Sequence, residues 1–153
     1  MQDIDSFDRK ILSVLAEQGR VSWRELGDRI GLSLTPTLRR VRRLEADGYI
    51  EGYEARLSEP KLGGHMSVFV SISLGRQASD TLMTFDRSIL ELPEVMECYL
   101  MTGDADYLVR IVVNDLPHYQ TVVDRIAQIP DINHIKSSFS LRPVVQRRSP
   151  LLR

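Results

Sequence analysis

Hydrophobic residues recur about every third or fourth position through the first part of the chain, a spacing that predicts amphipathic helices. Each expected helix begins at a residue that can cap it and ends before a glycine. The three helices run from Asp5 or Ser6 to Gly19, from Ser22 to Gly31, and from Ser33 to Gly48. Because the second and third are separated only by Gly31-Leu32-Ser33, the segment predicts a helix-turn-helix.

In the second part of the chain the spacing of the hydrophobic residues changes from the helical period to alternation. Apolar and polar residues alternate from Met66 to Leu74, which predicts a half-buried strand. The patterns after it predict a helix over 78–90, strands over 95–101 and 107–113, a helix from Pro117 to Pro130, and a strand over 132–141. This β-α-β-β-α-β order is typical of the ferredoxin-like fold, with helices on one face of an antiparallel sheet. The other face stays open, and dimerisation would cover it.

The fold class is therefore α+β, with a helical N-terminal domain and a ferredoxin-like C-terminal domain. Residues 49–57 alternate weakly, which suggests a small ribbon or wing that continues into a linker. We place the first domain at residues 1–57, a turn-rich linker at 58–64, the second domain at 65–142 and a C-terminal tail at 143–153.

The third helix has an aliphatic side and an arginine-rich side. Leu38, Val41 and Leu44 form one stripe, whereas Arg39 and Arg43 fall away from it. An aliphatic back, a cationic front and small polar residues at the N-terminus suit the DNA major groove. An ordinary solvated basic face on a surface helix explains the same pattern, and this segment by itself does not decide between the two.

The overall charge of the chain does not indicate a nucleic-acid partner, because the net charge is −1. Residues 1–60 hold 10 Lys and Arg against 11 Asp and Glu, yet four of these arginines lie within residues 39–43. Such a local stripe can still act on phosphates over a screening length of about 10 Å.

Other features restrict the class of protein. The single cysteine, Cys98, excludes an internal disulfide and lies in an apolar run that favours a buried thiol. No apolar run approaches the length of a membrane span, and the polar, acidic N-terminus is unlike a signal peptide. We therefore expect a cytoplasmic protein with no membrane partner.

A second candidate site is the turn TGDADYL at residues 102–108. Gly103 can expose backbone N–H groups, and Asp104 and Asp106 place two carboxylates in one tight turn. A zwitterion needs a carboxylate for its ammonium group and backbone amides for its own carboxylate. A hairpin whose acidic residues only form Asx turns is the alternative, and from the residues alone it is the more common case.

The whole chain resembles the Lrp/AsnC family of bacterial and archaeal transcriptional regulators. The resemblance rests on several motifs in the same order and spacing. They are Ile4-Asp5 with Asp8 and Ile11-Leu12, Gly31-Leu32-Ser33, Thr35-Pro36, Arg40-Val41-Arg42-Arg43-Leu44-Glu45, Gly48-Tyr49-Ile50, and Gly103-Asp104 with Asp106-Tyr107-Leu108. It implies a winged helix-turn-helix joined to an effector-binding domain, amino acids as effectors, and dimers that often assemble further into octamers.

On this interpretation the third helix enters the major groove of double-stranded DNA. We expect Thr35, Pro36, Thr37 and Arg39 to approach base edges and Arg40, Arg42 and Arg43 to hold phosphates, with Ser33 at the helix start. Arg42 could instead pair with Glu45 on the same helix. One copy reads too few bases for a unique site, so we expect a pseudo-palindromic operator with half-sites about one DNA turn apart.

The resemblance also implies an effector pocket between neighbouring dimers. Its expected residues are Thr102, Gly103, Asp104, Ala105, Asp106 and Tyr107 from the turn, and Ser137, Ser138 and Phe139 from the last strand. Several relatives carry an aromatic residue where this chain has Ala105, so the pocket should be larger or more open here. No cofactor or metal is expected.

Two other classes of function remain as alternatives. An enzyme is disfavoured because His65, His118 and His134 lie in separate elements without ligand spacing, and no nucleophile-base motif or phosphate loop is visible. A metabolite sensor that joins other subunits without binding DNA is disfavoured by the arginine stripe.

Overall fold

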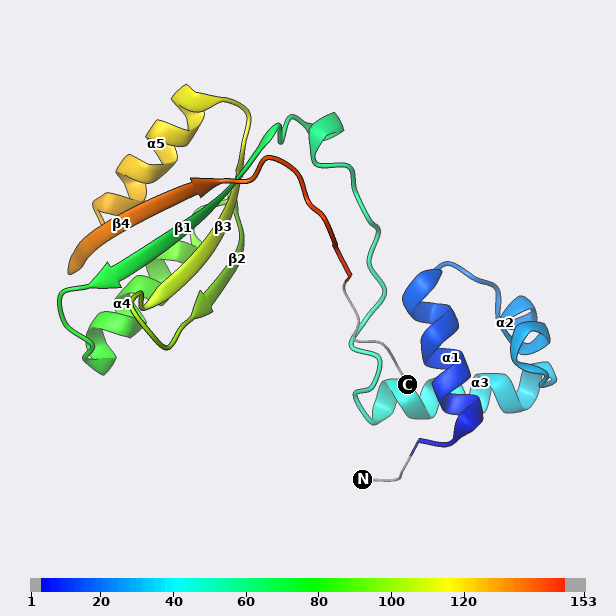
Figure 1. Cartoon of the computed structure of the whole chain (residues 1–153). Coiled ribbons are helices and arrows are strands. Elements are labelled where there is room, and N and C mark those ends of the chain that lie inside the picture. The colour runs from blue at the N-terminus through cyan, green and yellow to red at the C-terminus, as the bar shows by residue number, and fades with distance from the viewer. Residues whose placement is uncertain (1–3, 148–153) are drawn as a thin grey trace. The chain divides into compact units, whose positions relative to one another are not determined.

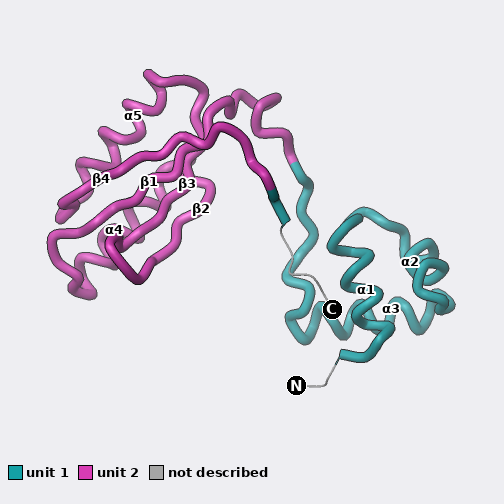
Figure 2. Tube along the Cα trace, viewed as in Figure 1, with its two compact units in different colours: residues 1–56, 145–153 teal, residues 57–144 magenta. Residues whose placement is uncertain are grey.

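The structure is a computed structural model that describes residues 4–147. The chain divides into two compact units, residues 1–56 with 145–153 and residues 57–144 (Figure 2). Each unit has a hydrophobic core of its own.

The first unit contains three helices, α1 (Ser6–Glu17), α2 (Trp23–Ile30) and α3 (Leu34–Ala46) (Figure 1). The predicted helices are confirmed, with Asp5, Ser22 and Ser33 as the N-cap residues. Gly31 ends α2 and Gly48 comes shortly after α3, and both adopt positive φ. Glycine takes this conformation at low conformational cost. The helices enclose a small core made of Ile11, Val21, Leu26, Ile30, Val41 and Leu44.

The segment after α3 differs from the expectation of a ribbon. Tyr49 and Ile50 pack against the helical core, but residues 50–57 form neither helix nor strand. A two-stranded ribbon requires a second strand to accept its hydrogen bonds, and this segment has no such neighbour among the described residues of its own chain.

The second unit is an antiparallel four-stranded sheet with two helices, preceded by a short 3-10 turn. Its elements are η1 (Pro60–Leu62), β1 (Met66–Leu74), α4 (Ser79–Leu90), β2 (Val95–Leu100), β3 (Tyr107–Val113), α5 (Leu116–Ala127) and β4 (Ile132–Phe139). The strand order is β2-β3-β1-β4, so the predicted ferredoxin-like arrangement is confirmed. The last strand ends at Phe139, two residues earlier than expected, and residues 140–147 contain no helix or strand. The tail was expected at 143–153, and its residues 148–153 lie outside the described residues.

Both helices cover one face of this sheet (Figure 1). From Val68 onward every second residue of β1 is buried, as the alternation predicts, and every second residue of β3 is buried as well. These side chains pack with Phe85 of α4 and Ile126 of α5. The opposite face carries the intervening residues, including Phe69 of β1 and Arg110 of β3. Part of this face lies against the turn around η1, because Glu59 bonds to Arg110 and Gly64 closely approaches Val112.

Candidate nucleic-acid interface and effector loop

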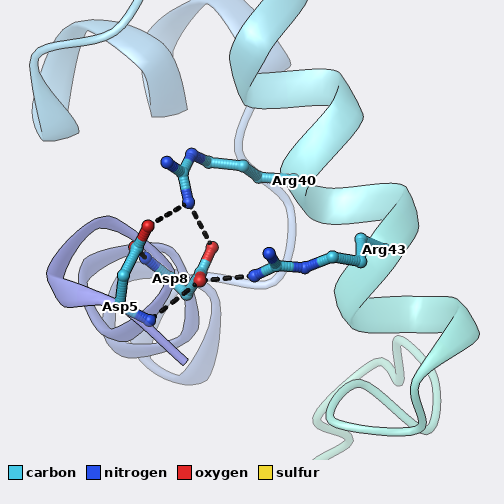
Figure 3. A network of polar contacts seen from close by, with 4 residues as sticks. All are labelled: Asp5, Asp8, Arg40 and Arg43. Carbon is cyan, nitrogen blue, oxygen red and sulfur yellow. Dashed lines mark hydrogen bonds and ion pairs between the residues drawn. The ribbon is translucent and has the colours of Figure 1, made fainter. Parts of the chain in front are cut away.

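The arginines of α3 do not share one environment, because α1 presents two aspartates to part of the helix (Figure 3). Asp8 is fully buried, and its Oδ1 accepts a hydrogen bond from Arg40 Nη1 at 2.9 Å. Its Oδ2 accepts one from Arg43 Nη2. Asp5 accepts a further bond from Arg40 Nη1 at 2.6 Å. Arg40 and Arg43 therefore tie α3 to α1.

The two aspartates are held in place by the first turn of α1. The backbone N–H of Asp8 donates to Asp5 Oδ1 at 2.9 Å, and the N–H of Asp5 donates to Asp8 Oδ2 at 3.0 Å, a reciprocal capping box. The bond from the Asp8 N–H, with help from Arg40, lowers the pKa of Asp5 to about 2. The hydrogen bonds to Asp5 and then to Asp8 raise the pKa of Arg40, whose guanidinium also lies 5.4 Å from the centre of the Phe7 ring.

Arg39 and Arg42 are different, because both are exposed on α3. Among residues 4–147 neither has a carboxylate partner, and the alternative Arg42–Glu45 pair is not formed. Glu45 instead accepts a hydrogen bond from Tyr53 at 2.9 Å. The cationic charge that α3 offers to solvent is thus concentrated on these two arginines.

The N-terminal turn of α3 presents only some of the residues expected at base edges. Ser33 and Thr35 are exposed and Pro36 is half-buried. Thr37 is fully buried, and its hydroxyl donates to the backbone oxygen of Ser33 at 2.9 Å. The side chain of Thr37 therefore stabilises the first turn of α3 from its buried side. The exposed positions closest to it in the chain that were expected at base edges are Thr35 and Arg39.

In the second unit, the turn between β2 and β3 contains both exposed and structural residues. Asp106 is buried, and its carboxylate accepts hydrogen bonds from the Leu74 N–H at 2.7 Å and from the Gln77 side chain. Tyr107 is also buried; it stacks on Phe85 and donates to Asp86 at 2.8 Å. Burial first, and then the bond to Asp86, raise the pKa of Tyr107. Asp106 therefore holds the end of β1, and Tyr107 holds the start of β3 against α4.

The exposed part of this turn consists of Thr102, Gly103 and Asp104, followed by half-buried Ala105. Gly103 has φ +118°, a conformation that favours glycine, and no atom lies within 4 Å of where a Cβ would stand. The Asp104 backbone oxygen accepts a bond from Ser73 at 3.1 Å, so the Asp104 carboxylate is carried on an anchored turn.

The structure does not bring the last-strand residues to this turn within one chain. Ser138 pairs with Phe69, whereas Asp104 contacts Ser73, four residues further along β1. At about 3.3 Å per residue these positions are roughly 13 Å apart along the strand. Ser137 and Phe139 lie on the helix-covered side of β4, where the Phe139 ring meets Tyr119.

Of the remaining candidates for chemistry, His118 and Cys98 occupy structural positions. His118 Nδ1 accepts the Asn114 N–H, and its Nε2 lies 3.2 Å from Glu94, which also pairs with Arg125. Burial raises the pKa of the Cys98 thiol to about 11. Within residues 4–147 no group of three or more His, Cys, Asp or Glu side chains is arranged to hold a metal ion. No helix in this range has the length and apolar character that crossing a membrane requires.

A helix-turn-helix with an exposed cationic recognition helix, joined to a ferredoxin-like domain, defines a DNA-binding regulator with a separate ligand-binding domain. Family models agree with both parts: "Winged helix-turn-helix DNA-binding" matches residues 4–51, and "Lrp/AsnC ligand binding domain" matches residues 67–150. The chain belongs to the Lrp/AsnC family of transcription regulators.

Curated relatives and solved structures support this assignment. The chain is 53% identical to the Bkd operon transcriptional regulator of Pseudomonas aeruginosa over 153 residues, covering 99% of this chain and 100% of the relative. It is 40% identical to the leucine-responsive regulatory protein of Escherichia coli over 146 residues, covering 95% and 89%. A transcriptional regulator from Neisseria meningitidis, solved as an L-methionine complex, superposes with a TM-score of 0.92 at 34% identity, covering 97% and 96%.

Asp8 is the main site residue that the sequence analysis did not assign a role. The signal was present as Asp5-x-x-Asp8 at the start of a helix, a spacing that allows a capping box. That this box would also bind two arginines of α3 depends on how the helices pack.

Proposed function

We propose that this protein is a cytoplasmic regulator that binds paired DNA half-sites as a homo-oligomer and responds to an apolar amino acid. The DNA-binding part of the proposal rests on one observation: some arginines of α3 are bound by carboxylates and others are not. Arg39 and Arg42 are exposed without carboxylate partners, whereas Arg40 and Arg43 are bound by Asp8. We assign base contacts to Thr35, Pro36 and Arg39, with Ser33 at the entrance to the groove, and a phosphate contact to Arg42.

Arg39→Ala tests this assignment. An arginine bound to guanine through two hydrogen bonds discriminates against other bases by about 1–3 kcal/mol. The variant should therefore lose its preference for operator over competitor DNA in a competition gel shift, while its helical circular dichroism stays unchanged.

Arg42→Ala is the matched control, because it removes the same charge from the same exposed side of α3. It should weaken binding to operator and competitor DNA alike. If Arg39→Ala retains the operator preference of the wild type, Arg39 does not read a base and the assignment is wrong.

The amino-acid effector is supported by the relatives. Several are named leucine-responsive regulatory proteins, and the structure from Neisseria meningitidis holds L-methionine. In this chain the exposed Asp104 carboxylate and the open backbone at Gly103 suit the two charged groups of an amino acid. The small Ala105 next to them leaves room for the side chain of such an effector.

Self-association is supported by the open face of the sheet. Phe69, Leu108 and Tyr99 place apolar surface there, and Phe69 and Tyr99 are exposed. An antiparallel sheet with such a face is commonly covered by a second copy, and symmetric pairing matches a pseudo-palindromic operator. We propose a dimer as the basic unit and an octamer as its higher assembly.

A further inference from the structure

The segment that joins α3 to β1 is exposed through residues 51–58, yet it is fixed at two positions. The first is Tyr53. Its ring meets Trp23 edge-on at 6.4 Å, and its hydroxyl donates to Glu45 at 2.9 Å. A Cβ on Gly19 would lie 4.0 Å from the same ring. Tyr53 thus reaches the residues after α1, the start of α2 and the end of α3, and it belongs to the helical unit.

The second fixed position is Glu59. Its two carboxylate oxygens accept hydrogen bonds from Arg110 Nη1 and Nη2 at 3.3 and 3.0 Å, a paired arrangement. The same guanidinium donates to Glu97 at 3.1 Å, and the Arg110 side chain is only 12% exposed. Burial lowers the pKa of Arg110, but the bonds to Glu59 and Glu97 outweigh it and the pKa is raised.

The turn that follows Glu59 is packed directly onto β3. The Glu59 backbone oxygen accepts bonds from the Leu62 N–H at 3.0 Å and the Gly64 N–H at 2.8 Å. A Cβ on Gly64 would lie 2.4 Å from Val112 Cγ1, so only glycine permits this close approach. Residues 59–64 are therefore part of the sheet unit, and the segment able to change shape is shorter than its sequence suggests.

We infer that Tyr53 and Glu59 are positioning residues that fix the length of the tether between the DNA-binding and ligand-binding units, and thereby select the half-site spacing that the oligomer binds. Fully extended, the chain from Tyr53 to Glu59 spans at most about 21 Å. If Glu59 is released and the turn after it opens, the next fixed point is Gly64 against Val112 of β3, and the reach rises to roughly 40 Å. The first value leaves each DNA-binding unit little freedom around its ligand-binding unit, whereas the second allows displacements comparable to one DNA turn of about 34–36 Å.

This difference matters because two linked binding units bind together only when the tether can span their sites. A short tether restricts the oligomer to one spacing, whereas a long one accepts additional spacings with smaller losses. The inference rests on the proposed oligomer on paired half-sites, and it concerns spacing rather than the base contacts of α3.

Glu59→Ala tests the inference, and Arg110 keeps Glu97 as a partner in this variant. Full-length protein is bound to duplexes carrying the wild-type protein's selected half-sites, either at their preferred spacing, with about 10 additional base pairs between them, or as a single half-site. We expect the wild type to lose about tenfold or more in affinity on the longer duplex and Glu59→Ala to lose less than about threefold. Affinity for the single half-site should be the same for both.

Glu51→Ala is the control, because it removes an exposed carboxylate from the same segment outside the two anchors. It should keep the spacing preference of the wild type. An equal spacing preference in Glu59→Ala and wild type overturns the inference, whereas loss of sequence preference on the single half-site in Arg39→Ala concerns the DNA assignment alone.

Limited trypsin digestion of the full chain provides an independent measurement. Arg56 lies between the anchors and Lys61 lies inside the packed turn. We expect Glu59→Ala to increase the cleavage rate after Lys61 about tenfold or more while leaving cleavage after Arg56 unchanged, because local opening controls proteolysis. Equal cleavage after Lys61 in both proteins shows that Glu59 does not hold the turn, and overturns the inference.

Discussion

At the scale of single residues, the fully buried Asp8 divides the arginines of α3 into two groups. A buried carboxylate needs compensating charge and hydrogen bonds, so Arg40 and Arg43 are held on the α1 side of the helix. Arg39 and Arg42 are exposed. Counting positive residues along α3 therefore overestimates the charge available to DNA.

The salt dependence of DNA binding distinguishes the two groups. Arg42→Gln should reduce the slope of log affinity against log salt by about one unit, because one phosphate contact is lost. Arg40→Gln should leave the slope unchanged and lower the free energy of unfolding by about 1–3 kcal/mol, because Asp8 loses a charged partner. The slopes come from DNA titrations at several salt concentrations, and the stability from urea unfolding.

Both variants remove one positive charge from the same helix, so each serves as the control for the other. An equal decrease in slope for both would show that Arg40 leaves Asp8 to bind a phosphate in the complex. In that case the ion pairs of the free protein would not describe the bound state.

At the scale of elements, the connection between α2 and α3 depends on a close backbone approach at Gly27. A Cβ there would lie 2.6 Å from the Leu32 backbone oxygen and 3.1 Å from Thr37 Oγ1. The Leu32 N–H also donates to the Gly27 oxygen at 2.9 Å, which closes the turn. The position of α3 relative to α2 is therefore set by a residue that contributes no side chain.

Gly27→Ala should displace this turn and lower the stability of the helical unit by roughly 1–3 kcal/mol, as overpacking of a buried site does. Trp23 is the only tryptophan, so its fluorescence during urea unfolding reports on this unit. Gly52→Ala is the control, since no atom lies within 4 Å of its Cβ position. Equal stability of the two variants would mean that the turn relaxes at little cost.

At the scale of the whole molecule, DNA and effector are assigned to different units with separate cores. A ligand can change DNA binding only through its different affinity for two states of the assembly. The spacing selected by the tether is one property that such states could change.

Effector binding should be visible as thermal stabilisation of the full-length protein. A ligand at 100 times its dissociation constant adds about 2.7 kcal/mol to the folded state. We expect leucine or methionine to raise the unfolding temperature and lysine and glutamate to have no effect. Ala105→Tyr should change the order of responses among the amino acids, because it fills the space beside Asp104. An unchanged order would show that Ala105 does not line the pocket.

Much of the fold is encoded locally. The three helices with their capping residues, the alternation of β1 and the β-α-β-β-α-β order were all predicted, because each depends on periodicity, caps and turns that neighbouring residues specify. The structure adds the spatial strand order β2-β3-β1-β4. The expected ribbon over residues 49–57 was wrong, since pairing requires a partner strand that local pattern cannot supply.

The sequence by itself determined the two-part architecture, the arginine-rich helix and the family resemblance. Only the tertiary structure decided which polar residues have partners within the fold and which remain available for ligands. Thr37 and Asp106 were expected at sites and are buried. Tyr53, in the expected ribbon, and Glu59, in the expected linker, are instead fixed to the units on either side. The physical reason is that a side chain's availability depends on its partners in space, and those partners lie up to 51 residues away in the chain.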